Sequence, residues 1–291
     1  MTTAVVAARP ESMLGQLARK EIARYASHPL FLVGVALVAL TSIGKPDGNM
    51  SSLGNVIAPA AGFGVIGLLV MASLTRTSDQ IATAAGAVVV TERTRTLGLL
   101  CALIVPFAAG LCWLGWAIWA CRHWPPPPYG APFGDIGDGW VLANFIALGV
   151  LPALGGPILG LLVGRWVPRR GAAPLIAVLV VAETILMQGL FESLRYIRPV
   201  APWTYFAGPV GVEGDADRMV VLTGSPQWYC VYLLVLCALG VVLALLHDRE
   251  RPRRPLLIAL GVIAALAVVT ATLAITTGVQ DVMINPLRSQ P

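Results

Sequence analysis

Charged residues are scarce in this sequence of 291 residues. They make up 12% of the chain, whereas hydrophobic residues make up 57% and the mean hydropathy is +0.77. Soluble domains carry about 25% charged residues, and a water-soluble fold of this length needs charges to cover its surface. The shortage therefore excludes an ordinary soluble domain and favours a membrane protein.

The sequence also lacks the motifs of the common catalytic chemistries. No GxxxxGKS/T phosphate loop occurs, so we do not expect the chain to hydrolyse ATP itself. There is no GxSxG elbow and no HExxH pair, and the three histidines have no partner at metal-ligand spacing. We therefore expect no catalytic residue, no bound cofactor, no metal site and no enzymatic activity of the chain's own.

The five cysteines form no CxxC pair and all fall in apolar runs or at their ends. We interpret them as small buried hydrophobic residues, with a disulfide between Cys121 and Cys230 as the alternative. The formal charge of +5 does not indicate nucleic acid, because the basic residues flank apolar runs and no basic patch interleaved with aromatic residues occurs.

Seven apolar runs predict seven membrane spans, because a helix needs about 20 apolar residues to cross the hydrocarbon core. The first run is short by that measure, so it begins inside the preceding amphipathic segment or crosses a thinned bilayer. The last run spans or forms a flexible C-terminal anchor. The runs are 29–44, 53–75, 97–121, 140–164, 172–191, 228–246 and 256–279.

The distribution of Lys and Arg predicts the orientation. With the N-terminus inside, 14 of the 20 basic residues fall in inner connectors. We therefore expect a multi-pass membrane protein with its N-terminus in the cytoplasm and, if the last run spans, its C-terminus outside. The inner basic residues are Arg9, Arg19, Lys20, Arg24, Arg76, Arg93, Arg95, Arg165, Arg169, Arg170, Arg249, Arg251, Arg253 and Arg254.

Residues 11–27 predict an amphipathic helix that lies along the inner membrane surface. Leu14, Leu17 and Tyr25 gather on one side of the helical wheel, and the basic residues lie mostly on the other. Glu21 falls on the apolar side. It either faces inward and pairs with an arginine, or contacts a partner subunit.

The polar bridge Arg76–Thr96 between the second and third runs is long for a turn between helices. Ser78 or Asp79 can cap a short helix that runs through Ile81. The charged ends of the bridge suit docking against a polar groove of another protein. The alternative is a solvated loop held to lipid phosphates by its arginines.

Glu183 is the one acidic residue that falls inside a predicted span. An ionised carboxylate at mid-bilayer costs roughly 3 kcal/mol on insertion scales. The functional interpretations are a substrate pathway or a proton relay. The alternative is polar contact between helices, a role that Gln188 on the same helix would share.

The order of these features resembles the permease subunit of type-2 ABC exporters, particularly the divergent actinobacterial kind. The resemblance covers about residues 12–254. The matching pieces are LARKEIARYASHP, VVVTERTRTLGLLCALIVP, RYIRPVAPWTYF, GSPQWYCVYLL and LLHDRERPRR.

This resemblance implies an all-α six-helix core with an N-terminal connecting helix and a coupling helix near Asp79–Gly86, both of which contact ATPase subunits. Short re-entrant outer helices would lie near Gln188–Tyr205. The bridge departs from the family in lacking a full GT-x-E-x-L pattern, and the seventh run exceeds the core. The implied coupling residues are Arg76, Ser78, Asp79, Gln80, Ile81, Glu92, Arg93 and Arg95, and those of the connecting helix are Leu14, Leu17, Glu21 and Tyr25.

We thus expect three regions: a cytoplasmic N-terminus at 1–28, a six-span permease domain at 29–247, and a C-terminal part at 248–291. The permease domain includes the inner segment 76–96 and a large outer loop at 192–227. The expected function is export of an amphipathic or hydrophobic cargo, such as a drug, natural product, peptide or lipid, across the bacterial cell membrane. We expect the chain to act with a second permease copy or homologue and with two ATPase subunits that bind ATP and Mg. A proton-coupled secondary transporter that uses Glu183, or a non-transporting membrane enzyme or scaffold, is the alternative.

Overall fold

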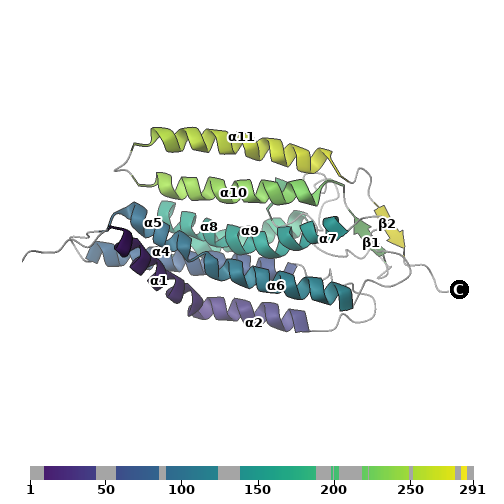
Figure 1. Ribbon diagram of the computed structural model, residues 1–291, viewed down its shortest axis with the longest axis horizontal. Helices are drawn as coiled ribbons and strands as arrows, with labels where there is room; N and C mark the ends of the chain where they lie inside the picture. Colours follow the sequence, from purple (N-terminus) through teal and green to yellow (C-terminus); the bar gives the residue numbers. More distant parts are fainter. Residues whose placement is uncertain are drawn as a thin grey trace, which may run out of the picture.

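The computed structural model describes residues 10–43, 57–84, 90–123, 138–187, 198, 200–202, 218–221, 223–248, 252–278 and 283–286. These segments are helical apart from short connections and two strands, and most of the long helices lie side by side along one axis (Figure 1). The elements are α1 (Pro10–Ala26), α2 (Pro29–Ile43), α3 (Ile57–Pro59), η2 (Ala60–Val65), α4 (Ile66–Ala84), α5 (Glu92–Cys101), α6 (Ile104–His123), α7 (Asp138–Phe145), η3 (Ile146–Val150), α8 (Leu151–Trp166), α9 (Ala172–Ile185), β1 (Arg218–Val221), α10 (Pro226–Leu246), α11 (Arg254–Thr276) and β2 (Met283–Pro286).

Five helical runs in the described residues are long and apolar enough to cross a membrane. Each overlaps one predicted span, so the expectation of a helical, polytopic membrane protein is confirmed at that level. The runs are Ile57–Ala82, Glu92–His123, Gly139–Trp166, Pro226–Leu246 and Arg254–Thr276.

The first and fifth predicted spans differ from this pattern. Helix α2 does not continue α1 in a straight line, because the two helices meet at a bend of 53° around Ser27 and His28. Pro29 opens α2, a position where its missing N–H leaves no helical hydrogen bond unmade. Helix α9 has 14 residues and is followed by Leu186 and Met187, and the rest of the fifth predicted span, 188–191, lies outside the described residues.

The predicted bridge Arg76–Thr96 is helical at both ends. Helix α4 continues to Ala84, so Ser78 and Asp79 lie inside a helix and cap none. The capping interpretation is therefore wrong. The cap belongs to α5, where the hydroxyl of Thr91 accepts a hydrogen bond from the backbone N–H of Thr94 at 3.3 Å.

The centre of the bundle is the contact of α8 with η2 and α4. Gly156, Gly160 and Gly164 recur every fourth residue and present one face of α8 without side chains. A Cβ atom at 156 would lie 2.0 Å from the backbone oxygen of Gly64, and one at 160 would lie 2.2 Å from that of Leu68. Small residues at this spacing let two membrane helices approach to backbone contact.

We call this contact of α8 with η2 and α4, along Gly156, Gly160 and Gly164, the glycine seam. The helical runs on both sides of it contain a π-helical turn. The turns are η2 and η3, and Gly64 of η2 faces Pro152 of α8, directly after η3. Such turns are rare and widen a helix locally. They precede the parts of α4 and α8 that lead toward the candidate site, at the end of the bundle that we call inner because the predicted orientation places it in the cytoplasm.

A pair of short strands, which the sequence did not predict, lies at the end of the bundle opposite to α1 (Figure 1). Strand β1 precedes α10, strand β2 follows α11, and the two pair antiparallel with Met219 opposite Asn285. The backbone N–H of Ser225 also donates to the oxygen of Ala274 at 2.9 Å. Helices α10 and α11 therefore run antiparallel, with both outer ends held together.

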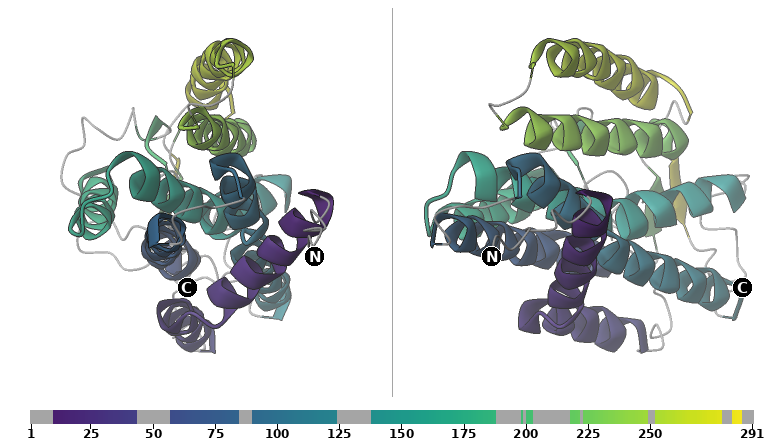
Figure 2. Two further views of the ribbon diagram at one scale, coloured as in Figure 1. Left: turned by 90° about the vertical axis from the view of Figure 1, so that its left-hand side faces the viewer. Right: turned by 60° about the vertical axis from the view of Figure 1, so that its left-hand side comes forward.

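Helix α11 lies at the edge of the bundle, against α10, as the end-on view in Figure 2 shows. Most of its apolar residues are exposed, including Ile258 and Val268.

The interpretation of the five cysteines as buried residues needs correction, because Cys101 and Cys112 are exposed. All five cysteines are free thiols, so no Cys121–Cys230 disulfide is present.

Candidate functional site

The inner ends of four helices meet in a chain of alternating charges. Asp79 of α4 accepts from Arg95 of α5 at 2.9 Å and from Arg165 of α8 at 2.5 Å. Arg165 also lies 3.8 Å from Glu92 of α5, and Glu92 contacts Nδ1 of His247, which follows α10. We call Arg95, Asp79, Arg165, Glu92 and His247 the inner ionic chain.

Arg165 is the buried centre of this chain, with 2% of its side chain exposed. A guanidinium removed from water is costly unless carboxylates and hydrogen-bond acceptors surround it. Asp79 and Glu92 supply the charge, and the Thr96 hydroxyl accepts from Nη2 of Arg165 at 3.2 Å. The three helices α4, α5 and α8 are therefore held together at their inner ends by one side chain.

Local structure explains how these residues converge. Arg165 lies in the last turn of α8, where a cation stabilises the helix dipole, and Glu92 lies in the first turn of α5, where an anion does so. The glycine seam brings α8 against α4, and Gly164 packs on Thr75, one turn before Asp79. Backbone approach along the seam thus sets the position of the ion pair.

Helix α1 crosses the inner ends of α4 and α5 obliquely (Figure 2). A Cβ atom at Gly98 of α5 would lie 3.0 Å from Cγ of Leu17, so α1 packs directly on α5. Tyr25, at the end of α1, is fully buried and meets the Phe31 ring edge-on at 5.2 Å. The amphipathic helix is thus packed on the bundle through its apolar side.

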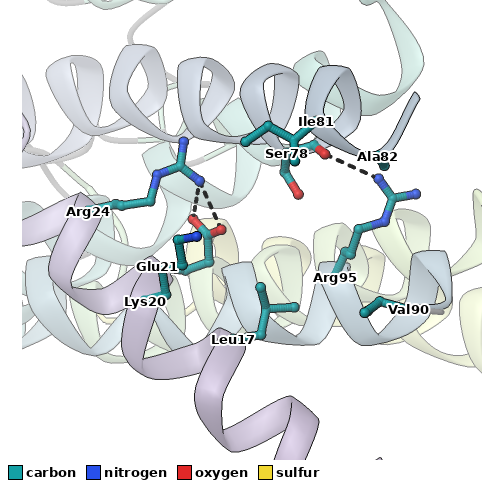
Figure 3. A pocket seen from close by; sticks show the side chains of 9 residues that line it. All are labelled: Leu17, Lys20, Glu21, Arg24, Ser78, Ile81, Ala82, Val90 and Arg95. Atoms are coloured by element: carbon teal, nitrogen blue, oxygen red, sulfur yellow. Dashed lines mark hydrogen bonds and ion pairs between the residues drawn. The ribbon is translucent and has the colours of Figure 1, made fainter. Parts of the chain in front are cut away.

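A cavity of about 260 Å³ lies between α1 and the ends of α4 and α5 (Figure 3). We call it the α1 pocket. Ile81 on its rim is 57% exposed, an unusual position for an isoleucine beyond the apolar part of its helix. The lining residues are Leu17, Lys20, Glu21, Arg24, Ser78, Ile81, Ala82, Val90 and Arg95.

Glu21 lines this pocket and is 3% exposed. Its two carboxylate oxygens each lie 2.9 Å from Nη1 of Arg24, one turn further along α1. Of the two interpretations of Glu21, the structure agrees with the first, in which the carboxylate faces inward and pairs with an arginine.

The residues predicted for coupling lie at one end of the bundle, but their surroundings differ. Asp79, Glu92 and Arg95 belong to the inner ionic chain, whereas Gln80 and Arg93 are exposed. The remaining members are placed as follows: Arg76 donates to the backbone oxygen of Arg170 at 3.3 Å, Ser78 is buried, and Ile81 forms the rim. The residues predicted for the connecting helix, Leu14, Leu17, Glu21 and Tyr25, all lie on the side of α1 that faces the bundle.

Sequence reasoning missed Arg165 and His247. Arg165 was counted only as an inner basic residue, although it directly follows an apolar run that ends in Gly164. That position was a usable signal, because a lone arginine within the last turn of a span needs an anionic partner. The contact between His247 and Glu92 joins residues 155 positions apart. No feature of the sequence near either residue indicates it.

The second set of predicted polar residues lies elsewhere. Glu183 is on α9 and partly exposed, and its side chain forms no hydrogen bond or ion pair with another described residue, although it lies close enough to Tyr232 of α10 for a charge interaction. Gln188 lies outside the described residues, as does most of the predicted outer segment Gln188–Tyr205. From that segment, Val200 and Ala201 accept hydrogen bonds from the hydroxyls of Tyr232 and Tyr229.

No group of three or more His, Cys, Asp or Glu side chains suitable for a metal occurs among the described residues. No protein-family model, curated protein or solved structure matches this chain.

Proposed function

We propose that this chain is the membrane-spanning permease subunit of an ABC-type exporter. It moves an amphipathic or hydrophobic cargo across the bacterial cell membrane, with ATP and Mg bound by two separate ATPase subunits and with a second permease copy or homologue. The observation that carries the proposal is the α1 pocket, where an amphipathic helix and the extension of α4 form a cavity outside the predicted apolar runs 53–75 and 97–121.

The exposed residues of this region suit a protein partner. Ile81 is 57% exposed, and Gln80 beside it is exposed too. An apolar rim with polar neighbours is the usual composition of a contact surface between proteins. The ATPase subunit would dock over Ile81 and against α1.

The inner ionic chain supports a way to transmit movement from that surface. Displacement of the α4–α5 end moves Asp79 and Glu92, and both are bonded to Arg165 of α8. Glu92 also contacts His247 after α10. Packed helices have discrete arrangements. A displacement of α4 and α5 would therefore move α8 and α10 as whole helices.

The cargo class follows from the lining that the chain can offer. The five helical runs that are long enough to cross a membrane are strongly apolar, and Glu183 is the one carboxylate within a predicted span. A pathway between such helices favours an apolar or amphipathic molecule over a multiply charged one.

Co-purification tests the proposal. The tagged chain is co-expressed with phosphate-loop ATPases encoded beside it, extracted in mild detergent and assayed for a stable complex and for ATPase activity. We expect the Ile81→Asp variant to lose the complex, because it places a charge on the docking rim. Val167→Asp is the matched control, since Val167 is also an exposed aliphatic residue at the inner end of the bundle but does not line the pocket.

Two outcomes would reject the exporter. A chain that purifies alone and binds no ATPase contradicts the proposed partner. If such a chain also carries out proton-dependent transport that Glu183→Gln abolishes, it is a secondary transporter.

A further inference from the structure

A second cavity lies at the inner end of the last two helices, away from the α1 pocket. Its volume is about 270 Å³, and it lies between the start of α5, the end of α10 and the start of α11. We call it the α10–α11 pocket. It is lined by Arg93, Leu245, Asp248, Pro252, Pro255 and Leu256.

Three basic residues around this cavity form no ion pair within the described part of the chain. Arg93 lines it, and Arg253 and Arg254 lie between the two lining prolines; all three are exposed. None of these guanidinium groups forms an ion pair with another described residue. They differ in this from Arg95 and Arg165, which the inner ionic chain holds.

The wall on the membrane side is apolar. Leu245 lies in the last turn of α10, and Leu256 lies in the first turn of α11. The start of α11 adds a partial positive charge. One carboxylate, Asp248, is also in the lining, but it is buried and already has an interaction partner.

This combination matches an anionic phospholipid. The predicted orientation places the pocket at the cytoplasmic leaflet, which is where anionic lipids attract basic residues near the ends of spans. A phosphate would meet Arg93, Arg253 and Arg254, and the upper part of an acyl chain would lie against Leu245 and Leu256. An acidic protein segment would satisfy the arginines but would leave the leucines without an apolar partner.

We infer that the α10–α11 pocket binds one phospholipid of the inner leaflet with an anionic headgroup, held by Arg93, Arg253 and Arg254. Because α11 packs mainly on α10, this lipid would fasten its inner end, as the β1–β2 pair fastens its outer end. The inference goes beyond the exporter proposal and does not depend on it.

Native mass spectrometry of the full chain, purified in mild detergent and titrated with cardiolipin or with phosphatidylcholine, tests the inference. We expect one tightly retained cardiolipin and no equivalent retention of phosphatidylcholine. Each change to Gln at Arg93, Arg253 or Arg254 should weaken retention about fivefold, which corresponds to about 1 kcal/mol per basic residue.

Two further variants separate a built site from general attraction to basic residues. Arg169→Gln changes an exposed arginine that lies on the same predicted membrane face, and it should leave the retention of cardiolipin unchanged. Leu256→Trp, which fills the cavity and keeps every charge, should abolish it. Equal loss in Arg169→Gln would overturn the inference, as would full retention in Leu256→Trp or the absence of a tightly held cardiolipin.

Discussion

The Nη1 atom of Arg165 lies 2.5 Å from Oδ1 of Asp79, although the two residues are 86 positions apart in the sequence. The contact joins the inner end of α8 to α4, and it is asymmetric. Arg165 is 2% exposed, whereas Asp79 is 37% exposed and has Arg95 as a second partner. Removing the carboxylate should therefore cost more than removing Arg95.

Asp79→Ala leaves Arg165 buried, with Glu92 at 3.8 Å and the Thr96 hydroxyl as its partners. We expect the free energy of unfolding in detergent to fall by about 3 kcal/mol, the lower end of the range for breaking a buried pair, because water reaches Asp79. Arg95→Gln should cost about 1 kcal/mol, since that side chain is less deeply buried. Adding Arg165→Met to Asp79→Ala should restore most of the loss. Equal stability of Asp79→Ala and the parent would show that Arg165 does not depend on Asp79.

The glycine seam gives a second prediction. The Cβ atom of Gly156→Ala would lie 2.0 Å from the backbone oxygen of Gly64, so α8 and η2 would have to separate. We expect a loss of about 3 kcal/mol, at the upper end for overpacked sites, and a lower yield of monodisperse protein in size-exclusion chromatography. Gly115→Ala on α6 is the control, because no atom lies within 4 Å of a Cβ built there. A normal yield of Gly156→Ala would mean that the seam is loosely packed.

The two unusual glutamates should respond in opposite ways to the same substitution. The carboxylate of Glu183 is partly exposed on α9 and forms no hydrogen bond or ion pair with another described residue, so Glu183→Gln removes a costly charge from a predicted span. We expect unchanged or higher thermal stability and unchanged ATP-driven export. Glu21→Gln loses the pair with Arg24 and should lower thermal stability. Loss of export in Glu183→Gln would assign that carboxylate to the cargo pathway or to a proton relay.

The spans could be predicted from the sequence because apolar length is a local property. Five of the seven predicted runs correspond to helices long enough to cross a membrane. The bend before Pro29 and the continuation of α4 through Asp79 to Ala84 were not predicted, since packing against α1 and α8 decides them. Polar residues such as Ser78 favour caps as local signals, but here tertiary contacts override that preference.

The candidate site could be predicted only in part. The sequence indicated Asp79, Glu92 and Arg95, because charges that interrupt an apolar chain are conspicuous. It did not show that Arg165 and His247 engage two of them, since contacts over 86 and 155 positions depend on how α8 and α10 return to the inner end. The pairing of β1 with β2 was missed for the same reason, because each strand has four residues and no alternation long enough to recognise.

Cross-linking tests both this strand pairing and the membrane topology. Met219 and Asn285 are directly opposite in the antiparallel register, where Cα atoms lie about 4.5–5.5 Å apart, a separation that a disulfide can span. In a background without the native cysteines, Met219→Cys with Asn285→Cys should form a disulfide on mild oxidation. Met219→Cys with Ile284→Cys should not, because a shift of one residue turns the side chain to the other face.

The single variant Asn285→Cys tests the orientation in the membrane. A membrane-impermeant thiol reagent added outside the cell should modify it, since both strands lie beyond the predicted outer ends of α10 and α11. No disulfide would contradict the strand pairing, and labelling from the cytoplasmic side alone would reverse the predicted orientation.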